Sequence, residues 1–348
     1  MSIVSGISDF FGLDIGTSSI RLVELHTSGR GALKELVKYA HMPIDSKVVL
    51  SDSKADQAKV AQAVRQLVAD SALTTRNVAV GLPSHKVFTT VIDMDRLPTN
   101  ELAKTIQYQA DTIIPTPVAE SKIDWALLGD SPKDKTKVEV LVTSVTNEFA
   151  ESRLDLLESI GLNLIAFEPE SIALLRALVP KEMVAPVLIL DIGSKAADLI
   201  IAMNGAPRLV RSIPTGSEAI IRSAAQNLNL SEDQAKQFVF KFGLSKEKLE
   251  GQVRGAILST IDLLTAEIEK SIKFFQTRYT DKKIDRIIVT GGASSLPEFP
   301  LYVASKFNVN VEIGNAWRNV AFPADRQNEL LALSNYFSVA AGLAEREE

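Results

Sequence analysis

Two short segments of the same type carry the residues best suited to chemistry. Residues 14–17 read Asp-Ile-Gly-Thr and residues 191–194 read Asp-Ile-Gly-Ser, about half a chain apart in a sequence of 348 residues. Each follows an apolar run, which predicts a strand, a tight turn and a second strand. The carboxylates of Asp14 and Asp191 could hold hydrated Mg²⁺, and the glycine and hydroxyl residues could surround an anion with N–H and O–H groups. One copy alone is typical of an ordinary turn, but two copies in equivalent halves favour a clamp for a phosphate chain.

A third candidate segment lies near the end of the chain. The apolar run 287–289 is predicted to be a buried strand, and it leads into residues 291–294, which read Gly-Gly-Ala-Ser. A pair of glycines after a strand allows a flat purine ring to approach the backbone, although such a pair alone is also typical of an unremarkable loop. Together, the three segments predict a site for a purine nucleotide and Mg²⁺. In that site, Asp14 and Asp191 would hold the metal through water.

The composition argues against several other classes of protein. Hydrophobic residues make up 46% of the chain, so it can bury large cores in two or more domains. A net charge of −5 with scattered basic residues argues against a nucleic-acid partner, and the lack of cysteine excludes disulfides and thiolate metal sites. His26, His41 and His85 are too far apart in the sequence to suggest a metal cluster. Since the sequence shows neither a signal-peptide pattern nor a run long enough to cross a membrane, we expect a soluble cytoplasmic protein.

The chain between the two Asp-Ile-Gly segments is predicted to contain an inserted unit. A helical period covers 53–72 and a strand covers 77–82, after which the pattern changes to β-α-β-β-α. The turn-rich segment 129–135 joins the two middle strands and makes them an antiparallel hairpin. We therefore expect 82–165 to form a small subdomain. Its strands are predicted at 87–94, 121–128 and 138–145, and its helices at 100–112 and 147–160.

The second half of the chain repeats the strand pattern of the first. The dipeptide 204–205, Asn-Gly, joins strands predicted at 196–203 and 208–213, and it suits a type I′ turn because both residues take positive φ. Apolar residues three or four apart predict one long helix over 253–275. A final helix is predicted over roughly 329–344.

These segments together resemble the superfamily of actin, Hsp70 and the sugar kinases. Residues 14–19 match its first phosphate motif, 191–194 its second and 291–297 its adenosine motif, so the resemblance spans nearly the whole chain. The inserted unit stands where FtsA-like cell-division proteins carry a small subdomain. The resemblance implies an α/β, actin-like (ribonuclease H-like) duplicated two-domain fold with an inserted β-α-β-β-α subdomain. The implied domains are 1A at 1–81 and 166–184, the inserted 1C (SHS2-like) subdomain at 82–165, and domain 2 at 185–348, whose last helix returns toward the interdomain hinge.

A narrower resemblance is to the PilM family of type IV pilus assembly proteins. It is carried by 113–120, which reads Ile-Ile-Pro-Thr-Pro-Val-Ala-Glu, by Ile-Asp-Trp at 123–125, and by the helical stretch 267–275. The resemblance implies a cytoplasmic platform that binds ATP (or ADP) with Mg²⁺ and is recruited to the inner face of the cytoplasmic membrane through its partners. It implies that 82–165 binds the cytoplasmic N-terminal peptide of a PilN-like membrane protein. Other pilus assembly proteins and motor ATPases are further implied partners, and a homo-oligomer is allowed.

The superfamily resemblance also assigns roles to residues outside the three segments. Arg21 stands where the family usually has a lysine that reaches the β and γ phosphates, and Glu170 stands where it keeps a residue that orients the attacking water. Arg21 could instead be a solvated strand residue, and Glu170 an acidic residue favoured at a helix start. Glu267 and Lys270 could equally form a surface salt bridge. The predicted nucleotide-binding residues are Asp14, Gly16, Thr17, Ser18, Ser19, Arg21, Asp191, Gly193, Ser194, Gly216, Glu218, Glu267, Lys270, Gly291, Gly292, Ala293 and Ser294.

Three classes of function are compatible with the sequence. The first is a nucleotide-dependent assembly platform, with tight binding and at most slow hydrolysis, because only Glu170 stands out as a water-orienting candidate. The second is a small-molecule kinase, but no separate motif supplies a carboxylate aimed at a substrate hydroxyl. The third is an FtsA-like division protein, or a nucleotide-free platform resembling the type II secretion protein GspL. Against these, residues 345–348 lack a basic amphipathic membrane tail and the phosphate motifs are intact.

Overall fold

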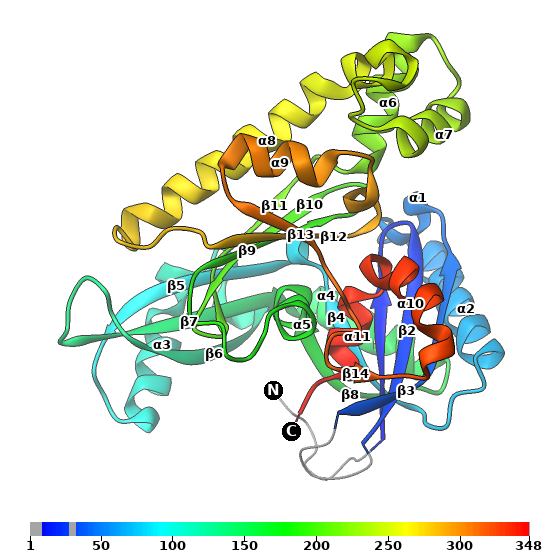
Figure 1. Ribbon diagram of the computed structural model, residues 1–348. Coiled ribbons are helices and arrows are strands. Elements are labelled where there is room, and N and C mark those ends of the chain that lie inside the picture. The colour runs from blue at the N-terminus through cyan, green and yellow to red at the C-terminus, as the bar shows by residue number, and fades with distance from the viewer. Residues whose placement is uncertain (1–8, 28–32, 348) are drawn as a thin grey trace.

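Two β-sheets of the same topology form the centre of the molecule, which the computed structural model describes for residues 9–27 and 33–347 (Figure 1). The first sheet contains β1 (Phe11–Ile15), β2 (Ser19–His26), β3 (Lys34–Pro43), β4 (Asn77–Leu82), β8 (Asn163–Pro169) and β14 (Val320–Ala321), and the second contains β9 (Val187–Ile192), β10 (Ala197–Met203), β11 (Ala206–Ile213), β12 (Arg286–Thr290) and β13 (Asn310–Ile313). The orders are β14-β3-β2-β1-β4-β8 and β11-β10-β9-β12-β13. In both sheets the first strand of the Asp-Ile-Gly hairpin has antiparallel strands on one side and parallel strands on the other. The predicted duplication is therefore confirmed.

A smaller three-stranded sheet lies in the sequence between β4 and β8, where the inserted unit is predicted. Its elements are β5 (Val87–Asp95), α3 (Thr99–Ile113), β6 (Ser121–Asp130), β7 (Lys137–Thr146) and α4 (Asn147–Ser159), in the predicted β-α-β-β-α order. β7 is the central strand, and β5 and β6 pair with it in antiparallel fashion. Leu102 and Ile106 of α3 share a separate hydrophobic core with Val140 and Val142 of β7. The inserted unit therefore has a core of its own.

The end of the inserted unit differs from the predicted boundary at residue 165. β8 begins at Asn163 and pairs in parallel with β4, so residues 163–165 belong to the first sheet. The helix α4 places Leu156 and Leu157 in the core of the first sheet rather than in that of the small sheet. Thus α4 joins the inserted unit to the first sheet.

Helices cover the outer face of each large sheet, and two short helices lie between the sheets (Figure 1). The helices are α1 (Ser46–Val49), α2 (Lys54–Asp70), α5 (Glu170–Leu178), α6 (Ser217–Leu228), α7 (Glu232–Phe242), α8 (Gln252–Arg278), α9 (Phe299–Phe307), α10 (Gln327–Leu333) and α11 (Ser338–Ala344). Apolar residues of α2 and α4 pack on the first sheet, and those of α6, α7, α8 and α9 pack on the second. Between the sheets, α5 packs against α11, and both share a core with β9, β10 and β12. This arrangement brings the first residue of α5, Glu170, to the space between the two Asp-Ile-Gly hairpins.

Two predicted local features of the second half are confirmed. The long helix expected over 253–275 is α8, which begins one residue earlier and ends three residues later. Asn204 and Gly205 join β10 to β11 with φ values of 53° and 72°, as a type I′ turn requires.

The last part of the chain differs from the prediction. The single helix expected over 329–344 is broken into α10 and α11, because the carbonyl of Asn335 accepts hydrogen bonds from the Gly291 N–H at 2.9 Å and the Thr290 hydroxyl at 3.2 Å. Residues from β14 onward also pack on the first sheet, although 185–348 is predicted to be one domain of which only the last helix returns toward the interdomain hinge. β14 pairs with β3, and α11 packs on β1 and β2. These contacts span most of the chain, so local sequence patterns do not reveal them.

Candidate functional site

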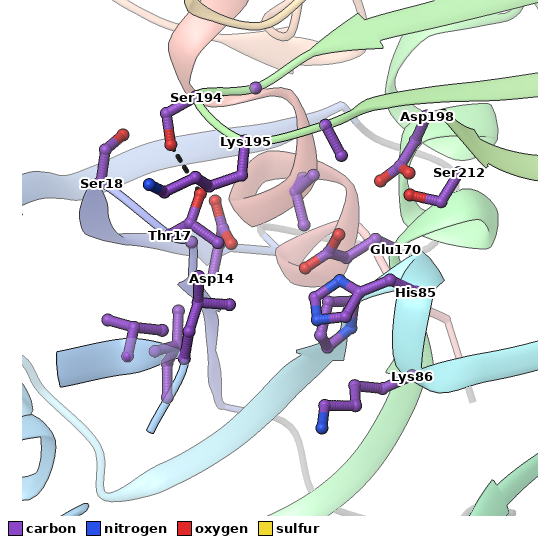
Figure 2. Close-up of a pocket in the computed structure, with 18 of the residues that line it drawn as sticks. Asp14, Thr17, Ser18, His85, Lys86, Glu170, Ser194, Lys195, Asp198 and Ser212 are labelled. Carbon is purple, nitrogen blue, oxygen red and sulfur yellow. Dashed lines mark hydrogen bonds between the residues drawn. The ribbon is translucent and has the colours of Figure 1, made fainter. Parts of the chain in front are cut away.

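The two Asp-Ile-Gly turns are closed by equivalent backbone hydrogen bonds and meet across a cleft. In each, the glycine N–H donates to the carbonyl three residues further on, at 3.1 Å for Gly16 and 2.9 Å for Gly193. The hydroxyl oxygens of Thr17 and Ser194 lie 2.7 Å apart, and Figure 2 shows these two side chains pointing toward one another. The turns therefore face each other, as the clamp predicted from the sequence requires.

A cavity of about 590 Å³ opens between the two turns. Its volume is in the range of a small-molecule or cofactor site. Its walls come from both large sheets, from α5, from α4 and from the segment between β4 and β5. The predicted residues that line it are Asp14, Gly16, Thr17, Ser18, Arg21, Glu170, Asp191, Gly193, Ser194, Gly291 and Gly292.

Carboxyl groups from both sheets and from α5 converge on this cavity. Its acidic lining includes Asp14, Glu170, Asp191 and Asp198. Burial raises the pKa of Glu170 well above its ordinary value, and the charges of the three aspartates raise it further. Burial and then the charge of Asp198 raise the pKa of Asp191 to about 7. Perturbed acids grouped in a cavity are typical of functional sites, and a bound cation would relieve their mutual repulsion.

The cross-strand partners of the two aspartates show where a cation fits. Asp14 faces Arg21 across β1 and β2, and the guanidinium donates to the carboxylate at 2.7 Å. At the equivalent place across β9 and β10, Asp191 faces Asp198. Like charges directly opposite each other destabilise a sheet, so a divalent cation beside Asp191 would stabilise this hairpin. The residues present therefore fit Mg²⁺ that is held by one or two carboxylates and keeps most of its waters.

Gly291 holds the third segment against the second aspartate. Its φ is +81°, and a Cβ atom added there would lie 2.2 Å from Asp191 Oδ1, so only glycine fits this position. The side-chain amide of Asn335 donates to the Gly291 carbonyl and to the Ser294 hydroxyl, both at 3.0 Å. Ala293 and Ser294 are completely buried beneath the turn. These two predicted residues therefore shape the cavity wall without lining it.

Three other predicted residues support the phosphate turns from behind. The carbonyl of Ser19 accepts the N–H of Gly16. Gly216 packs so closely on the second turn that a Cβ atom there would lie 2.5 Å from the Ser194 carbonyl oxygen. The Glu218 N–H donates to that carbonyl at 3.0 Å, and the Glu218 carboxylate accepts from Lys195 Nζ at 2.5 Å. They position the turn, and the cavity lining does not include them.

Glu267 and Lys270 are not brought to the cavity. They form an ion pair of 2.6 Å with each other on α8, and Arg211 lies 3.7 Å from the other oxygen of Glu267. The structure supports the alternative interpretation, in which Glu267 and Lys270 form a surface salt bridge. The sequence places them on one turn of α8, but it does not determine which side of that helix faces the cavity.

The lining also contains residues that sequence reasoning missed. They include His85, Lys86, Phe149, Arg153, Lys195, Asp198, Ser212, Asn335 and Tyr336. A signal for Asp198 exists in the duplication itself, because Asp198 follows Asp191 by the same interval as Arg21 follows Asp14. The others reach the cavity through tertiary packing, which the motif pattern does not contain.

Among the helices of residues 9–27 and 33–347, none combines the length and the apolar character that a membrane-crossing segment needs.

Comparison with solved structures identifies the fold as actin-like. The chain is similar to the PilM-PilN type IV pilus biogenesis complex, with a TM-score of 0.82, 24% identity, and coverage of 97% of this chain and 98% of that chain. It is also similar to ethanolamine utilization protein EutJ from Carboxydothermus hydrogenoformans, with a TM-score of 0.59, 16% identity, and coverage of 96% and 88%. For MreB5 of Spiroplasma citri bound to ADP, the TM-score is 0.56, the identity 14%, and the coverage 96% and 94%. The fold class predicted from the sequence is therefore confirmed.

Comparison with family models reaches beyond the fold. The model described as Type IV pilus assembly protein PilM matches residues 12–348, which include both hairpins, the inserted unit and the glycine pair. Because this match covers nearly the whole chain, the chain belongs to the PilM family of type IV pilus assembly proteins.

Proposed function

We propose that this chain is an ATP-binding platform for type IV pilus assembly, in which a nucleotide with Mg²⁺ bridges the two large sheets. The observation that carries the proposal is the meeting of the two Asp-Ile-Gly turns at the cavity, where the Thr17 and Ser194 hydroxyls are 2.7 Å apart. A protein of the same fold, MreB5 of Spiroplasma citri, binds ADP. ATP or ADP is therefore the ligand that this cavity is proposed to take.

The proposed partner is the cytoplasmic N-terminal tail of a PilN-like membrane protein. The chain is similar over 97% of its length to the solved PilM-PilN complex, and the inserted unit at residues 82–165 is the proposed docking region. Binding that tail would hold the platform at the inner face of the cytoplasmic membrane, beside other pilus assembly proteins and the motor ATPases. A homo-oligomer is compatible with this role.

Different residues are proposed to hold the phosphates, the magnesium and the adenosine of the nucleotide. The hydroxyls of Thr17, Ser18 and Ser194 would hold phosphate oxygens, and Arg21 would contribute positive charge while it stays bound to Asp14. Magnesium, when bound near Asp14 and Asp191, neutralises charge on the phosphates. The glycine pair 291–292 would leave room for the adenosine. These are the same three segments that the sequence singles out.

Glu170 is the proposed water-orienting residue. Burial, and then the charges of the neighbouring aspartates, raise the pKa of Glu170, so its carboxyl group holds a proton more strongly than an ordinary glutamate does. A carboxyl group at this place can position a water molecule, and the raised pKa makes the deprotonated form that a general base needs less favourable. We therefore propose tight nucleotide binding with slow hydrolysis, which suits a conformational clamp.

Replacing Asp14 by asparagine is expected to weaken Mg²⁺·ATP binding by about 10–100-fold. The change removes the charge that faces the hydrated metal, and it also weakens the hold on Arg21, which donates to Asp14 at 2.7 Å. Isothermal titration of Mg²⁺·ATP measures the effect. Glu267→Gln is the matched control, because Glu267 is outside the cavity lining, and its affinity is expected to stay within about twofold. Equal affinities for wild type and Asp14→Asn would contradict the proposed site.

The same preparations test the partner half of the proposal. A peptide with the N-terminal sequence of a PilN-like protein is titrated into wild type saturated with Mg²⁺·ATP. Binding is expected, and it should weaken in Asp14→Asn at ATP concentrations that saturate only the wild type, because linked sites influence each other equally. No binding to the ATP-saturated wild type would contradict the platform role while leaving the nucleotide site intact.

Nucleotide binding that depends on Mg²⁺ is expected to strengthen as the pH rises through about 7. Asp191 has a pKa of about 7 in the folded chain, so it is largely protonated at pH 6 and must lose that proton to face a cation. Between pH 6 and pH 8 the affinity for Mg²⁺·ADP should rise about tenfold, as expected for release of a single proton. Titrations at pH 6, 7 and 8 measure it, and ADP in EDTA is the control, for which no such rise is expected. An affinity that falls with pH in Mg²⁺ would exclude Asp191 as a metal-facing group.

A further inference from the structure

The cavity continues into a basic recess that the predicted nucleotide residues leave unused. The recess is bounded by the turn Ser84–Lys86, by the start of α4, and by the segment after α1. Figure 2 shows His85 and Lys86 below Glu170 in this view, on the side of the cavity away from the Thr17 and Ser194 turns. Arg153 and Phe149 of α4 complete its wall. The recess therefore adds the basic side chains of Lys86 and Arg153 to the cavity lining.

Arg153 is the central group of this recess. It is only 7% exposed, and its Nη1 atom is buried without a hydrogen-bond partner. Its guanidinium carbon lies 5.3 Å from the ring centroid of Phe149, and Lys86 Nζ lies 5.5 Å from the same centroid. A buried guanidinium with an unsatisfied N–H group is costly unless a partner occupies the space in front of it. The Phe149 ring thus holds the Arg153 side chain in place, and its Nη1 atom remains available to donate a hydrogen bond.

The neighbouring acidic groups do not pair with the buried Nη1 atom of Arg153. Asp52 and Glu148 line the cavity, but both are exposed, so water screens their attraction for Arg153. Glu170 is also part of the cavity lining, and burial raises its pKa. Burial lowers the pKa of Arg153, and the charges of Asp52 and Glu170 oppose that shift. None of these carboxylates forms a hydrogen bond with Arg153 Nη1, which has no hydrogen-bond partner among the described residues.

The start of α4 adds further attraction for an anion. Thr146 is the N-cap residue, and its hydroxyl accepts from the Phe149 N–H at 3.4 Å. The first turn of this helix, which has 13 residues, carries the positive end of the helix dipole. Thr146 and Phe149 both line the cavity. The helix end and the unpartnered arginine therefore point to the same kind of ligand.

We propose that Arg153, Lys86 and the first turn of α4 form an oxyanion subsite that takes a phosphate group. The proposal rests on the proposed nucleotide-binding function, and it adds a second phosphate position to the same cavity. Two sources share this chemistry: the terminal phosphate of the bound nucleotide, and free inorganic phosphate. In either case Arg153 donates hydrogen bonds to the phosphate oxygens, and Lys86 contributes its charge from the exposed rim.

The test uses the full chain with inorganic phosphate, Mg²⁺·ADP and Mg²⁺·ATP as probes in isothermal titration. Phosphate is titrated without nucleotide and with saturating Mg²⁺·ADP. Arg153→Met keeps most of the buried bulk but removes the charge and the donors. We expect it to weaken binding of the subsite's phosphate by about tenfold or more, while the affinity for Mg²⁺·ADP changes less than about twofold.

Two lysine variants keep the test decisive if Arg153→Met folds poorly. Lys86 is exposed, so Lys86→Ala should fold normally and weaken phosphate binding by about threefold or more. Lys59 is an exposed lysine of α2 that does not line the cavity. Lys59→Ala is therefore the matched control and should leave every affinity unchanged.

The outcomes distinguish the two sources of phosphate, and they distinguish a failure of the subsite from a failure of the proposed nucleotide-binding function. A loss of ATP affinity relative to ADP in Arg153→Met identifies the terminal phosphate of the nucleotide, and a loss of free phosphate binding alone identifies inorganic phosphate. If both the ATP to ADP ratio and the phosphate affinity are unchanged in Arg153→Met and Lys86→Ala, the subsite is overturned. A wild type that binds neither nucleotide overturns the proposed function instead, and the titration of phosphate without nucleotide then decides the subsite.

Discussion

Replacing Glu139 by glutamine is expected to lower the free energy of unfolding by about 3–5 kcal/mol, the usual cost of removing one partner from a buried ion network. Glu139 of β7 is 3% exposed. One of its oxygens accepts from Arg278 Nε at 2.8 Å and from the Tyr279 hydroxyl at 2.7 Å. Its other oxygen lies 3.4 Å from Nε of the buried Arg208. The amide of glutamine would leave two arginines facing a neutral group.

The ion network around Glu139 joins the inserted unit to the second large sheet, and β8 and α5 separate these two parts in the sequence. Glu139 and Asp93 belong to the small inserted sheet, and Arg278 Nη2 donates to Asp93 at 2.5 Å. Arg208 and Arg278 belong to β11 and α8 on the second large sheet. The inserted unit is therefore covalently attached to the first sheet and held by ionic contacts to the second. A movement of the inserted unit away from the second sheet would have to break this network.

Urea unfolding of Glu139→Gln against Glu151→Gln measures the effect. Glu151 forms a 3.8 Å pair with Lys122 in which both side chains are more than 60% exposed. Removing it should change stability by about 0.5 kcal/mol or less. A loss below about 1 kcal/mol in Glu139→Gln would show that water reaches the network and that it does not clamp the inserted unit.

Replacing Gly342 by alanine is expected to destabilise the chain by about 3 kcal/mol, which is the upper end of the usual loss of stability when a core is overpacked. α11 crosses α5 with no space between their backbones at this point. A Cβ atom at Gly342 would lie 1.9 Å from the carbonyl oxygen of Ala173, and 2.5 Å from its carbonyl carbon. Both helices are buried between the large sheets, so neither can move aside without disturbing a core.

Gly255→Ala is the matched control, because the same substitution at that position is expected to stabilise the chain rather than destabilise it. Gly255 is an exposed glycine inside α8, and a Cβ atom at that position meets no other atom within 4 Å. The gain in helix propensity should stabilise the chain by about 0.5–1 kcal/mol. Thermal and urea unfolding of the two variants measure the contrast. If Gly342→Ala were as stable as wild type, the close contact between α5 and α11 would be refuted.

Local sequence patterns predict the parts of the molecule whose structure is determined within one short segment. The hairpins follow from short apolar runs interrupted by Asp-Ile-Gly, and the inserted unit follows from alternating helix and strand periods separated by turn residues. The type I′ turn follows from one dipeptide. In the cavity, the residues of the two hairpin turns and the glycine pair were predicted for the same reason, since each belongs to a continuous segment with a recognisable backbone requirement.

The remaining features depend on contacts between distant segments. Arg153 reaches the cavity because α4 packs on the first sheet, and Asn335 does so because its carbonyl binds the Gly291 N–H. Neither contact leaves a pattern near those residues in the sequence. The prediction for Glu267 and Lys270 failed on orientation, because a helix period shows which residues share a face but not which neighbour that face meets.

The position of α11 has a consequence for how the chain is made. Gly12 of β1 packs against the Ala340 carbonyl, and the Lys34 ammonium donates to the carbonyl of Ala344, which is 310 residues further along the chain. During synthesis at about 5–20 residues per second, the first sheet would wait on the order of half a minute for the helix that covers its inner face. The strands that leave the ribosome first are therefore among the last to be covered, and until then their apolar side is available to chaperones.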